Sequence, residues 1–312
     1  MTPRPVDISI VIPVFNEEEN LAELFKRLAS VLSATRKTFE VIFVNDGSKD
    51  RSEQVLSQLY QGNQQIIRVI NFTRNFGHQM ALTAGLNYAK GKAVVIIDSD
   101  LQDPPEVIAE FIKKWQEGYE IVYGFRTKRE GETFFKKWTA GIFYKLIRRI
   151  TKIDIPENVG DFYLLDAKVV NFLNKIEERH RFLRGLVAWS GFKSVKVNYV
   201  RKARHAGKTK YPFWKMVKFS FDAITSFSFV PLRFVSTLGA IFSIMSFVTI
   251  FIIIYMKLFT NQTIIGWSSL MAVILFIGGI QLLAIGTIGE YIARIGDDVR
   301  HRPLYAVREI LE

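Results

Sequence analysis

The stretch ISIVIPVFNEEENLAELFKRLASVLSATRKTFEVIFVNDGS, residues 8–48, establishes the fold class of this chain. Two short runs rich in β-branched residues, ISIVIP at 8–13 and EVIFV at 40–44, each end in polar residues and predict strands. Between them, residues 17–32 carry leucines at helical spacing, namely Leu21, Leu24, Leu28 and Leu32. A strand, a helix and a second strand in this order predict a unit with parallel strands.

The same alternation continues along the chain. Helical patterns occupy residues 50–60, 78–89 and 106–115, and strand patterns occupy residues 66–71, 93–97 and 121–123. Strands that alternate with helices predict a mainly parallel sheet covered on both faces. In such sheets ligands bind beyond the carboxyl ends of the strands, so the polar residues at those ends are the candidate site.

The composition is that of a folded chain with a localised excess of positive charge. Of 312 residues, 49% are hydrophobic, which allows a large core and excludes wholesale disorder. The chain has no cysteine, which excludes disulfides, thiolate zinc sites and cysteine nucleophiles. The net charge is +12; residues 126–150 carry +6 and residues 193–218 carry +9, so the other segments are negative overall. Such basic surfaces attract nucleic acid, anionic lipid or phosphorylated substrates.

Two uncharged hydrophobic runs predict a transmembrane hairpin. Residues 234–256 and 267–289 would each form a helix about 34 Å long, enough to cross a bilayer core of about 30 Å. The alternative is a buried hairpin in a soluble protein. The N-terminus has no signal-peptide pattern and arginines follow the second run, so we expect both termini on the cytoplasmic side of the inner (plasma) membrane. The expected parts are a cytoplasmic domain at 1–229, a hairpin at 230–292 and a cytoplasmic tail at 293–312.

Acidic and amide side chains follow three of the predicted strands. Asn16 and Glu17 follow the first strand, Asp46 follows the second, and Asp98 and Asp100 follow the fourth. One acidic residue at a strand end is often only a helix N-cap. Three such strand ends in successive units predict a single acidic site at the carboxyl edge of the sheet, called the acidic mouth below. Asp98 and Asp100 flank a single residue on an extended tip, so both can reach one Mg²⁺ or Mn²⁺ ion. No glycine-rich phosphate loop occurs in the sequence, so metal and basic side chains would hold a diphosphate.

An ordered set of motifs in these segments resembles a known family. The motifs are VIPVFNEEENL (11–21), VNDGSKDRS (44–52), TRNFGHQMALTAGL (73–86), DSDLQDPPE (98–106), GDFYLLD (160–166) and RHAGKTKY (204–211). Together they extend over nearly the whole chain and resemble the family-2 glycosyltransferases of GT-A fold. Within that family they are most similar to the polyprenyl-phosphate glycosyltransferases, the group of the bactoprenol glucosyltransferases and dolichol-phosphate mannose synthases. The resemblance implies a Rossmann-like GT-A domain followed by two transmembrane helices.

The resemblance also implies roles for specific residues. Those expected to hold the base and ribose of a nucleotide-sugar donor are Pro13, Phe15, Asn16, Glu17, Val44 and Asp46. Asp98, Asp100 and Gln102 are expected to hold the metal, with Ser99 between them at the donor diphosphate. Arg126, Arg204 and Lys210 are expected to complete the phosphate site, the last two on a loop that could cover the donor. The alternative for Arg204 and Lys210 is a basic patch at the membrane surface.

Asp161 and Asp100 are the two expected catalytic residues. Asp161 lies in GDFYLLD, where the family has an acidic residue beside the reacting centre that is often described as a base. A phosphate monoester has a second pKa of about 6, so its attacking oxygen is largely ionised without a base. Asp161 could instead orient the acceptor or bind a sugar hydroxyl. Tyr163 and Ala167 stand where many family members carry arginine, which leaves the contacts of the acceptor phosphate open.

Two further segments are expected at the membrane surface. Residues 134–150 have an amphipathic pattern with lysines and arginines on one face, which fits a helix in the headgroup plane or an ordinary core-facing helix. Residues 211–229, beside the first hydrophobic run, contain Trp214 and several phenylalanines, which favours an interfacial position. Glycines in the second run permit close helix packing, so a homo-oligomer formed through the hydrophobic helices is expected.

The expected reaction is the inverting transfer of a hexose, preferably glucose from UDP-glucose, to a polyprenyl phosphate at an anionic membrane. Alternative donors are GDP-mannose, UDP-GlcNAc and an amino-arabinose donor. A processive polysaccharide synthase would carry a Q-x-x-R-W motif and more hydrophobic runs, which this sequence lacks. A non-enzymatic transport or channel subunit would leave the acidic strand ends unexplained. A nucleic-acid partner is not expected, because the basic segments contain no recognised binding module.

Overall fold

The computed structural model describes residues 5–129, 159–179, 181–201 and 266–312, with scattered positions between 232 and 259. The chain divides into two compact units, which are described separately: Met1–Val217 with Arg302–Glu312, and Lys218–His301. The segments expected at the membrane surface, 134–150 and 211–229, lie outside the described residues, as do Arg204 and Lys210.

The first unit is built on an eight-stranded sheet in the order β7-β5-β6-β4-β1-β2-β3-β8. The strands are β1 (Ile8–Val14), β2 (Phe39–Asn45), β3 (Ile67–Phe72), β4 (Ala93–Ile96), β5 (Ile121–Arg129), β6 (Val159–Asp166), β7 (Ser194–Arg201) and β8 (Val307–Leu311). Strands β1 to β4 pair in parallel, as do β5 and β7, whereas β6 and β8 run antiparallel to their neighbours. The prediction of a mainly parallel sheet is confirmed.

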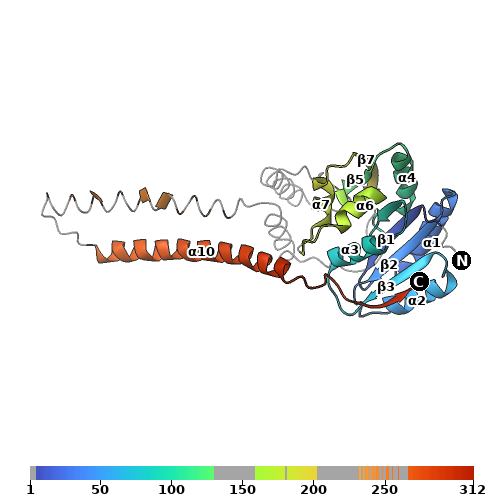
Figure 1. Ribbon diagram of the computed structural model, residues 1–312, viewed down its shortest axis with the longest axis horizontal. Coiled ribbons are helices and arrows are strands. Elements are labelled where there is room, and N and C mark those ends of the chain that lie inside the picture. The colour runs from blue at the N-terminus through green and yellow to red at the C-terminus, as the bar shows by residue number, and fades with distance from the viewer. Residues whose placement is uncertain are drawn as a thin grey trace. The chain divides into compact units, whose positions relative to one another are not determined.

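Helices cover both faces of this sheet (Figure 1). One face carries α1 (Leu21–Ala34), α2 (Ser52–Gly62) and α4 (Ile108–Gln116), and the other carries α3 (His78–Tyr88) and α6 (Ala167–Asn174), with α7 (Leu183–Trp189) packed on α6. Strand side chains alternate between the two cores, so Ile8, Ile10 and Ile12 join the leucine stripe of α1, whereas Ile42 and Val44 face α3. Each buried leucine of that stripe contributes about 2 kcal/mol of hydrophobic stabilisation.

Three element boundaries differ from the sequence prediction. Helix α1 begins at Leu21 rather than at residue 17, because Asn16 has a φ of 54° and the Glu17 N–H donates to Ser52 Oγ at 2.9 Å. These contacts hold the segment before α1 as a turn against the loop that follows β2. The helix expected at 106–115 opens with a 3₁₀ turn at Pro105–Val107, where Pro105 lacks an N–H to donate. The strand expected at 121–123 is longer, because it pairs on both sides with β6 and β7.

The last residues of the chain join the sheet of the first unit. Strand β8 pairs antiparallel with β3 and lies beside it in Figure 1. Glu312 lies 3.1 Å from Arg68 Nε, and its carbonyl accepts a hydrogen bond from the Tyr60 hydroxyl at 3.0 Å. Residues 293–312 were expected to form a tail, and strand β8 was not predicted, because a five-residue edge strand has no periodicity that distinguishes it from a loop.

In the second unit, α10 (Trp267–Val299) is a continuous helix of 33 residues. Within the described residues, Phe276–Val299 is the one helical segment long and apolar enough to cross a membrane. Several of its described large side chains are exposed; Leu282, for example, is 72% exposed. The second expected span therefore corresponds to α10, which continues past residue 289, but the expected pair of spans is not confirmed. The positions that the structure describes between 232 and 259 are helical, and the rest of that run lies outside the description.

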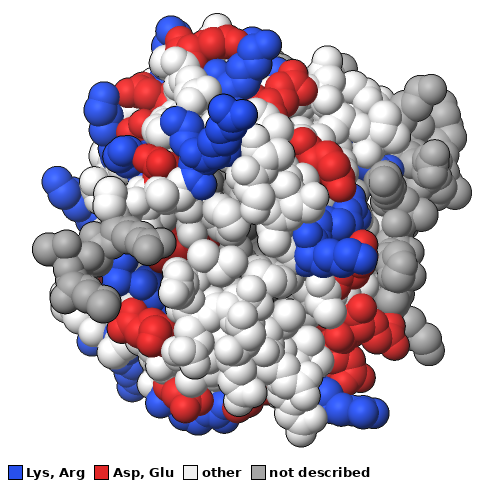
Figure 2. Space-filling model, turned by 90° about the vertical axis from the view of Figure 1, so that its right-hand side faces the viewer, with Lys and Arg blue, Asp and Glu red and all other residues white. Residues whose placement is uncertain are grey.

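The face of the molecule in Figure 2 carries charges of both signs. Lys and Arg side chains lie interspersed with Asp and Glu around areas without charged residues, and no large patch of one sign forms on this face. Much of the positive excess in the sequence belongs to residues 130–158 and 202–231, which lie outside the described part of the chain.

Candidate active site

The predicted acidic mouth forms at the carboxyl ends of the parallel strands. Asp98 and Asp100 follow β4 in a tight loop in which Leu101 has a φ of 58° and buries its side chain. The Gln102 N–H donates to Asp100 Oδ1 at 3.2 Å, which fixes the Asp100 carboxylate at the tip. Ser99 and Asp100 are buried, and the Asp98 side chain is about a quarter exposed. The loop therefore presents both carboxylates to one side of the sheet edge.

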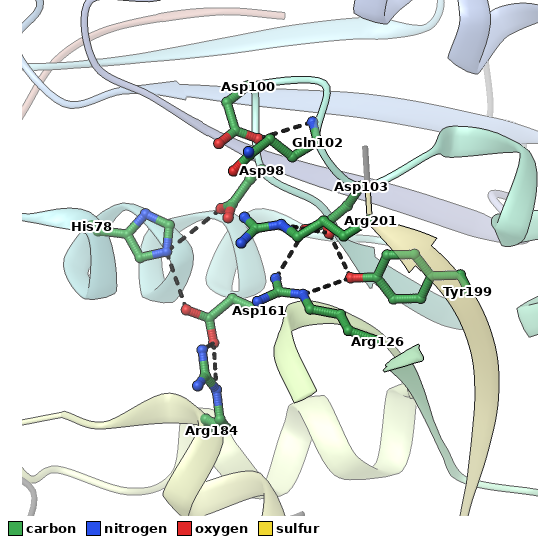
Figure 3. Close-up of polar contacts among 10 residues, drawn as sticks. All are labelled: His78, Asp98, Asp100, Gln102, Asp103, Arg126, Asp161, Arg184, Tyr199 and Arg201. Atoms are coloured by element: carbon green, nitrogen blue, oxygen red, sulfur yellow. Dashed lines mark hydrogen bonds and ion pairs between the residues drawn. The ribbon is translucent and has the colours of Figure 1, made fainter. Parts of the chain in front are cut away.

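The antiparallel strand β6 brings Asp161 to the same place. Ile96, the last residue of β4, pairs with Tyr163 of β6. Because the two strands run in opposite directions, residues beyond Ile96 in β4 meet residues before Tyr163 in β6. Asp161 consequently lies beside Asp98, although 63 positions separate them in the sequence. Figure 3 shows the two carboxylates on either side of His78.

His78, the first residue of α3, connects these carboxylates (Figure 3). Its Nε2 atom lies 3.3 Å from Asp161 Oδ2 and 3.7 Å from Asp98 Oδ1. Burial disfavours the charged imidazolium, but the hydrogen bond to Asp161 and the charge of Asp98 outweigh it and raise the pKa of His78 to about 9. The ring is therefore an imidazolium near neutral pH, and it neutralises part of the acidic mouth.

Arg184 of α7 is the second partner of Asp161. Its Nη2 and Nε atoms donate to Asp161 Oδ1 at 3.1 and 3.3 Å. Burial alone would raise the pKa of the Asp161 carboxyl, but Arg184 and His78 together hold it well below its usual range. Asp161 is therefore a carboxylate with two cationic partners, which makes it a weak proton acceptor.

His78 and Arg184 are site residues that the sequence did not predict. The signal for His78 was its position in the GHQ sequence that opens a predicted helix, directly after a glycine. Arg184 lies in a short helix that no periodic pattern marked, so its sequence context did not single it out. The N–H of Leu183 donates to the Gln79 side chain at 2.8 Å, which ties the start of α7 to α3 and so places Arg184 near His78.

Asp46 holds the loop that leads into α3. Its two carboxylate oxygens accept the N–H groups of Phe76 and Gly77 at 2.6 and 2.9 Å, and its carbonyl accepts from the Asn75 side chain. Burial outweighs these hydrogen bonds and raises its pKa. Asp46 was expected at the donor base; the structure shows that it also positions the N-terminus of the helix that carries His78.

The other residues expected at the donor base lie at the same sheet edge. Pro13 and Val44 are buried strand residues, and Phe15, Asn16 and Glu17 are partly exposed. The Asn16 side-chain oxygen accepts from Lys49 N–H at 2.7 Å, and its own N–H donates to Ser48 Oγ. The first two strand-end loops are therefore joined by hydrogen bonds into one rim. Buried Val44 could contact a ligand only through its backbone.

Arg126 was expected at the donor phosphates, and the structure places its guanidinium in a buried cluster with Asp103 and Tyr199. Its Nη2 lies 3.3 Å from Asp103 Oδ2, and its Nε donates to the Tyr199 hydroxyl at 2.9 Å. Tyr199 in turn donates to Asp103 at 2.5 Å, and Arg201 Nε lies 3.5 Å from the same carboxylate. The Arg126 side chain is only 9% exposed, because these partners draw it inward. To bind a donor phosphate, Arg126 would therefore have to contact the phosphate and Asp103 at the same time.

The acidic mouth suits a divalent cation together with a diphosphate. Within the described residues no group of three or more His, Asp or Glu side chains is arranged as a complete metal site. Asp98 and Asp100 nevertheless provide two carboxylates, and Mg²⁺ commonly binds through one or two carboxylates with substrate phosphates and water. Burial raises the pKa of Asp98 despite the opposing charge of His78, and the carboxylates of Asp100, Asp103 and Asp161 add to the rise. A cation bound here would stabilise the ionised form of Asp98. The donor set therefore fits the expected ion.

The fold and the site define a glycosyltransferase domain of GT-A type. The chain belongs to glycosyl transferase family 2, because the model of that family matches residues 9–173 and close relatives match over almost the whole chain. The uncharacterized glycosyltransferase YkcC of Bacillus subtilis (strain 168) is 52% identical over 98% of this chain and 94% of its own length. The family resemblance seen in the sequence is confirmed.

Two further comparisons describe its relatives. The bactoprenol glucosyl transferase of Shigella phage SfV is 41% identical over 96% of this chain and 98% of its own length. Among solved structures, glucosyl-3-phosphoglycerate synthase from Mycobacterium tuberculosis, in complex with Mn²⁺, UDP-glucose and phosphoglyceric acid, is similar with a TM-score of 0.48 and 19% identity. That match covers 70% of this chain and 77% of the synthase.

Proposed function

We propose that this protein transfers glucose from UDP-glucose to a polyprenyl phosphate, with inversion at the anomeric carbon. The observation that carries the proposal is the juxtaposition of Asp98 and Asp100 with Asp161, because two candidate metal ligands then lie next to a carboxylate held by His78 and Arg184. Bactoprenol glucosyl transferases that match nearly the whole chain at about 40% identity support the choice of sugar and acceptor.

In the proposed reaction the acceptor supplies its own nucleophile. A polyprenyl phosphate oxygen attacks the anomeric carbon from the face opposite the nucleotide, and the bond to the UDP oxygen breaks. A divalent ion held by Asp98 and Asp100, with Gln102 nearby, would neutralise the departing diphosphate. Asp161 fixes the geometry of the centre: its carboxylate is held by His78 and Arg184, so it can accept a hydrogen bond from a sugar hydroxyl. No proton needs to leave an ionised phosphate, so a general base is unnecessary.

We further propose that the protein is anchored in the inner membrane by two spans, with the catalytic unit in the cytoplasm. Helix α10 supplies one span, and the helical positions between 232 and 259 belong to the other. Arg204 and Lys210 would add cations to the phosphate site, and residues 134–150 and 211–229 would lie against anionic lipid. Among the described residues, nothing beyond the backbone of α10 itself lies within 4 Å of a Cβ added at Gly278, Gly279, Gly286 or Gly289, so this stripe of α10 could pack against a second copy.

The test is transfer by purified protein in detergent or lipid. With UDP-[¹⁴C]glucose, Mg²⁺ and polyprenyl phosphate, label should move to the lipid, whereas the Asp100→Ala variant should transfer at least about 100-fold more slowly. GDP-mannose, UDP-GlcNAc and an amino-arabinose donor tested in parallel identify the sugar. Absence of lipid label with every donor would contradict the proposal. An Asp100→Ala protein with full biological activity would instead favour a non-enzymatic role.

A further inference from the structure

Beside the acidic mouth, a buried cluster of Asp103, Arg126, Tyr199 and Arg201 pairs two guanidinium groups with one carboxylate. Asp103 is completely buried, and the guanidinium groups of Arg126 and Arg201 both contact its carboxylate. The Tyr199 hydroxyl also donates to Asp103, so its oxygens are well supplied with donors. Two guanidinium groups share this one carboxylate, so one of them can also contact an anion.

The two arginines are held differently. Arg126 is fixed by hydrogen bonds to Asp103 and Tyr199, and its side chain is 9% exposed. Arg201 has a longer contact of 3.5 Å from its Nε to Asp103, no hydrogen bond to that atom within the described residues, and a side chain that is 24% exposed. Arg201 is therefore the member of the pair that a ligand can reach.

The position of Arg201 on β7 points it toward the mouth. Val197 and Tyr199 bury their side chains in the core under α4, and Arg201 follows them with the same alternation at the last position of the strand. Arg201 therefore lies at the end of β7 where the strand reaches Asp103 in the loop after β4. In Figure 3 the guanidinium groups of Arg126 and Arg201 lie on the side of Asp103 that faces Asp98 and Asp161.

We propose that Arg201 is a further phosphate-binding residue of this site, with Asp103 as the residue that positions it. Its terminal nitrogens would donate to a phosphate oxygen of either the donor diphosphate or the acceptor phosphate. A guanidinium suits this role because its planar fork donates two parallel hydrogen bonds to phosphate. The inference rests on the proposed function for the identity of the two substrates, but the anion contact itself does not depend on transfer.

The experiment compares four full-length proteins: wild type, Arg201→Met, Arg201→Lys and the control Lys196→Met. Lys196 lies on the same strand with the opposite alternation and is exposed, its Nζ 5.5 Å from the centre of the Phe125 ring. Calorimetry measures the affinity of each protein for UDP with Mg²⁺ and, in a separate arm, for farnesyl phosphate. Melting temperatures report any loss of structure.

Arg201→Met should weaken one of the two probes by about 10- to 100-fold, the usual value for a hydrogen bond to a charged group. Arg201→Lys should recover part of that loss, and Lys196→Met should match the wild type. The weakened probe identifies which phosphate Arg201 contacts. Equal affinities of Arg201→Met and wild type in both arms overturn the inference, as does a loss that simply follows a lower melting temperature. Probe binding without sugar transfer by the wild type defeats the proposed function alone, and binding of neither probe defeats both.

Discussion

The Nε2 atom of His78 lies 3.3 Å from Oδ2 of Asp161, so the first residue of α3 holds a carboxylate of β6. The same ring nitrogen lies 3.7 Å from Asp98 on the loop after β4. One side chain thus spans the proposed cation site and the proposed reacting centre, and Arg184 completes the neutralisation of Asp161 from the opposite side.

This arrangement predicts that His78 acts on transfer rather than on donor binding. His78→Ala should lower kcat by about 10- to 100-fold with little change in the donor KM, because it removes a hydrogen bond to a charged group at the reacting centre. His78→Lys, which keeps the positive charge, should recover part of the rate. Steady-state kinetics with donor and acceptor varied separately measures both constants. A rise in donor KM with unchanged kcat would place His78 in the donor site instead.

Ionisation of the acceptor should contribute to the pH dependence, together with that of Asp98, whose pKa is raised by burial. Because a phosphate monoester loses its second proton at about pH 6, kcat/KM for the acceptor should rise as the pH is raised through that value. Burial opposes ionisation of Asp161, but Arg184 and His78 hold its pKa well below its usual range, so Asp161 does not titrate in this window. Asp161→Asn should lower the rate by about 100-fold or more and leave the rise in place. If the rise disappears in Asp161→Asn, Asp161 is a base.

Removal of the metal should abolish transfer and weaken the nucleotide. Asp98 and Asp100 share a crowded acidic site, and without a cation they repel the diphosphate. A chelator should therefore lower UDP affinity by at least about tenfold, and added Mg²⁺ or Mn²⁺ should restore it. Asp98→Asn should bind metal-free UDP at least as well as the wild type, since one repelling charge is gone, while responding less to added metal. Calorimetric titrations with and without metal test this, and an affinity indifferent to the chelator would contradict it.

An added side chain at Gly160 should disturb the Arg126 guanidinium. A Cβ at this position would overlap the Nη2 atom of Arg126, so Gly160→Ala must push the guanidinium away from Asp103. We expect a loss of about 1–3 kcal/mol in stability and slower transfer, because the arginine pair at Asp103 is disturbed. Gly62→Ala is the matched control, since in the described part of the chain nothing beyond its own helix backbone lies within 4 Å of the added Cβ. Thermal unfolding and transfer assays on both variants test this. Equal stability and equal transfer rates for the two variants would show that Arg126 can move aside at no cost.

The C-terminal strand should stabilise the catalytic unit. Truncation before Val307 removes the pairing with β3 and the contact of Glu312 with Arg68, which should cost about 2–4 kcal/mol and lower Tm by about 5–15 °C. Arg308→Ala serves as the control, because its exposed ion pair with Glu53 contributes less than about 1 kcal/mol. If the truncated protein has the same Tm as the full chain, β8 does not stabilise the catalytic unit.

The alternation of strands and helices and the acidic strand ends were readable from the sequence because both are local. Side-chain period identifies β1, β2 and α1 within a few residues, and parallel strands necessarily bring Asn16, Asp46 and Asp98 to one edge. The apolar length of α10 and the family motifs are likewise properties of continuous segments. These features determined the class of fold, the expected chemistry and the position of the candidate cation site.

Only the tertiary structure decided what surrounds those carboxylates. The antiparallel direction of β6 puts Asp161 beside Asp98, and the docking of α7 on α6 and α3 supplies Arg184. Asp103 contacts both a buried Arg126 and a partly exposed Arg201. Each contact joins residues many positions apart and depends on strand order, which local periodicity does not encode. The sequence by itself therefore determined which residues carry the charges, whereas the order of the strands decided which charges meet.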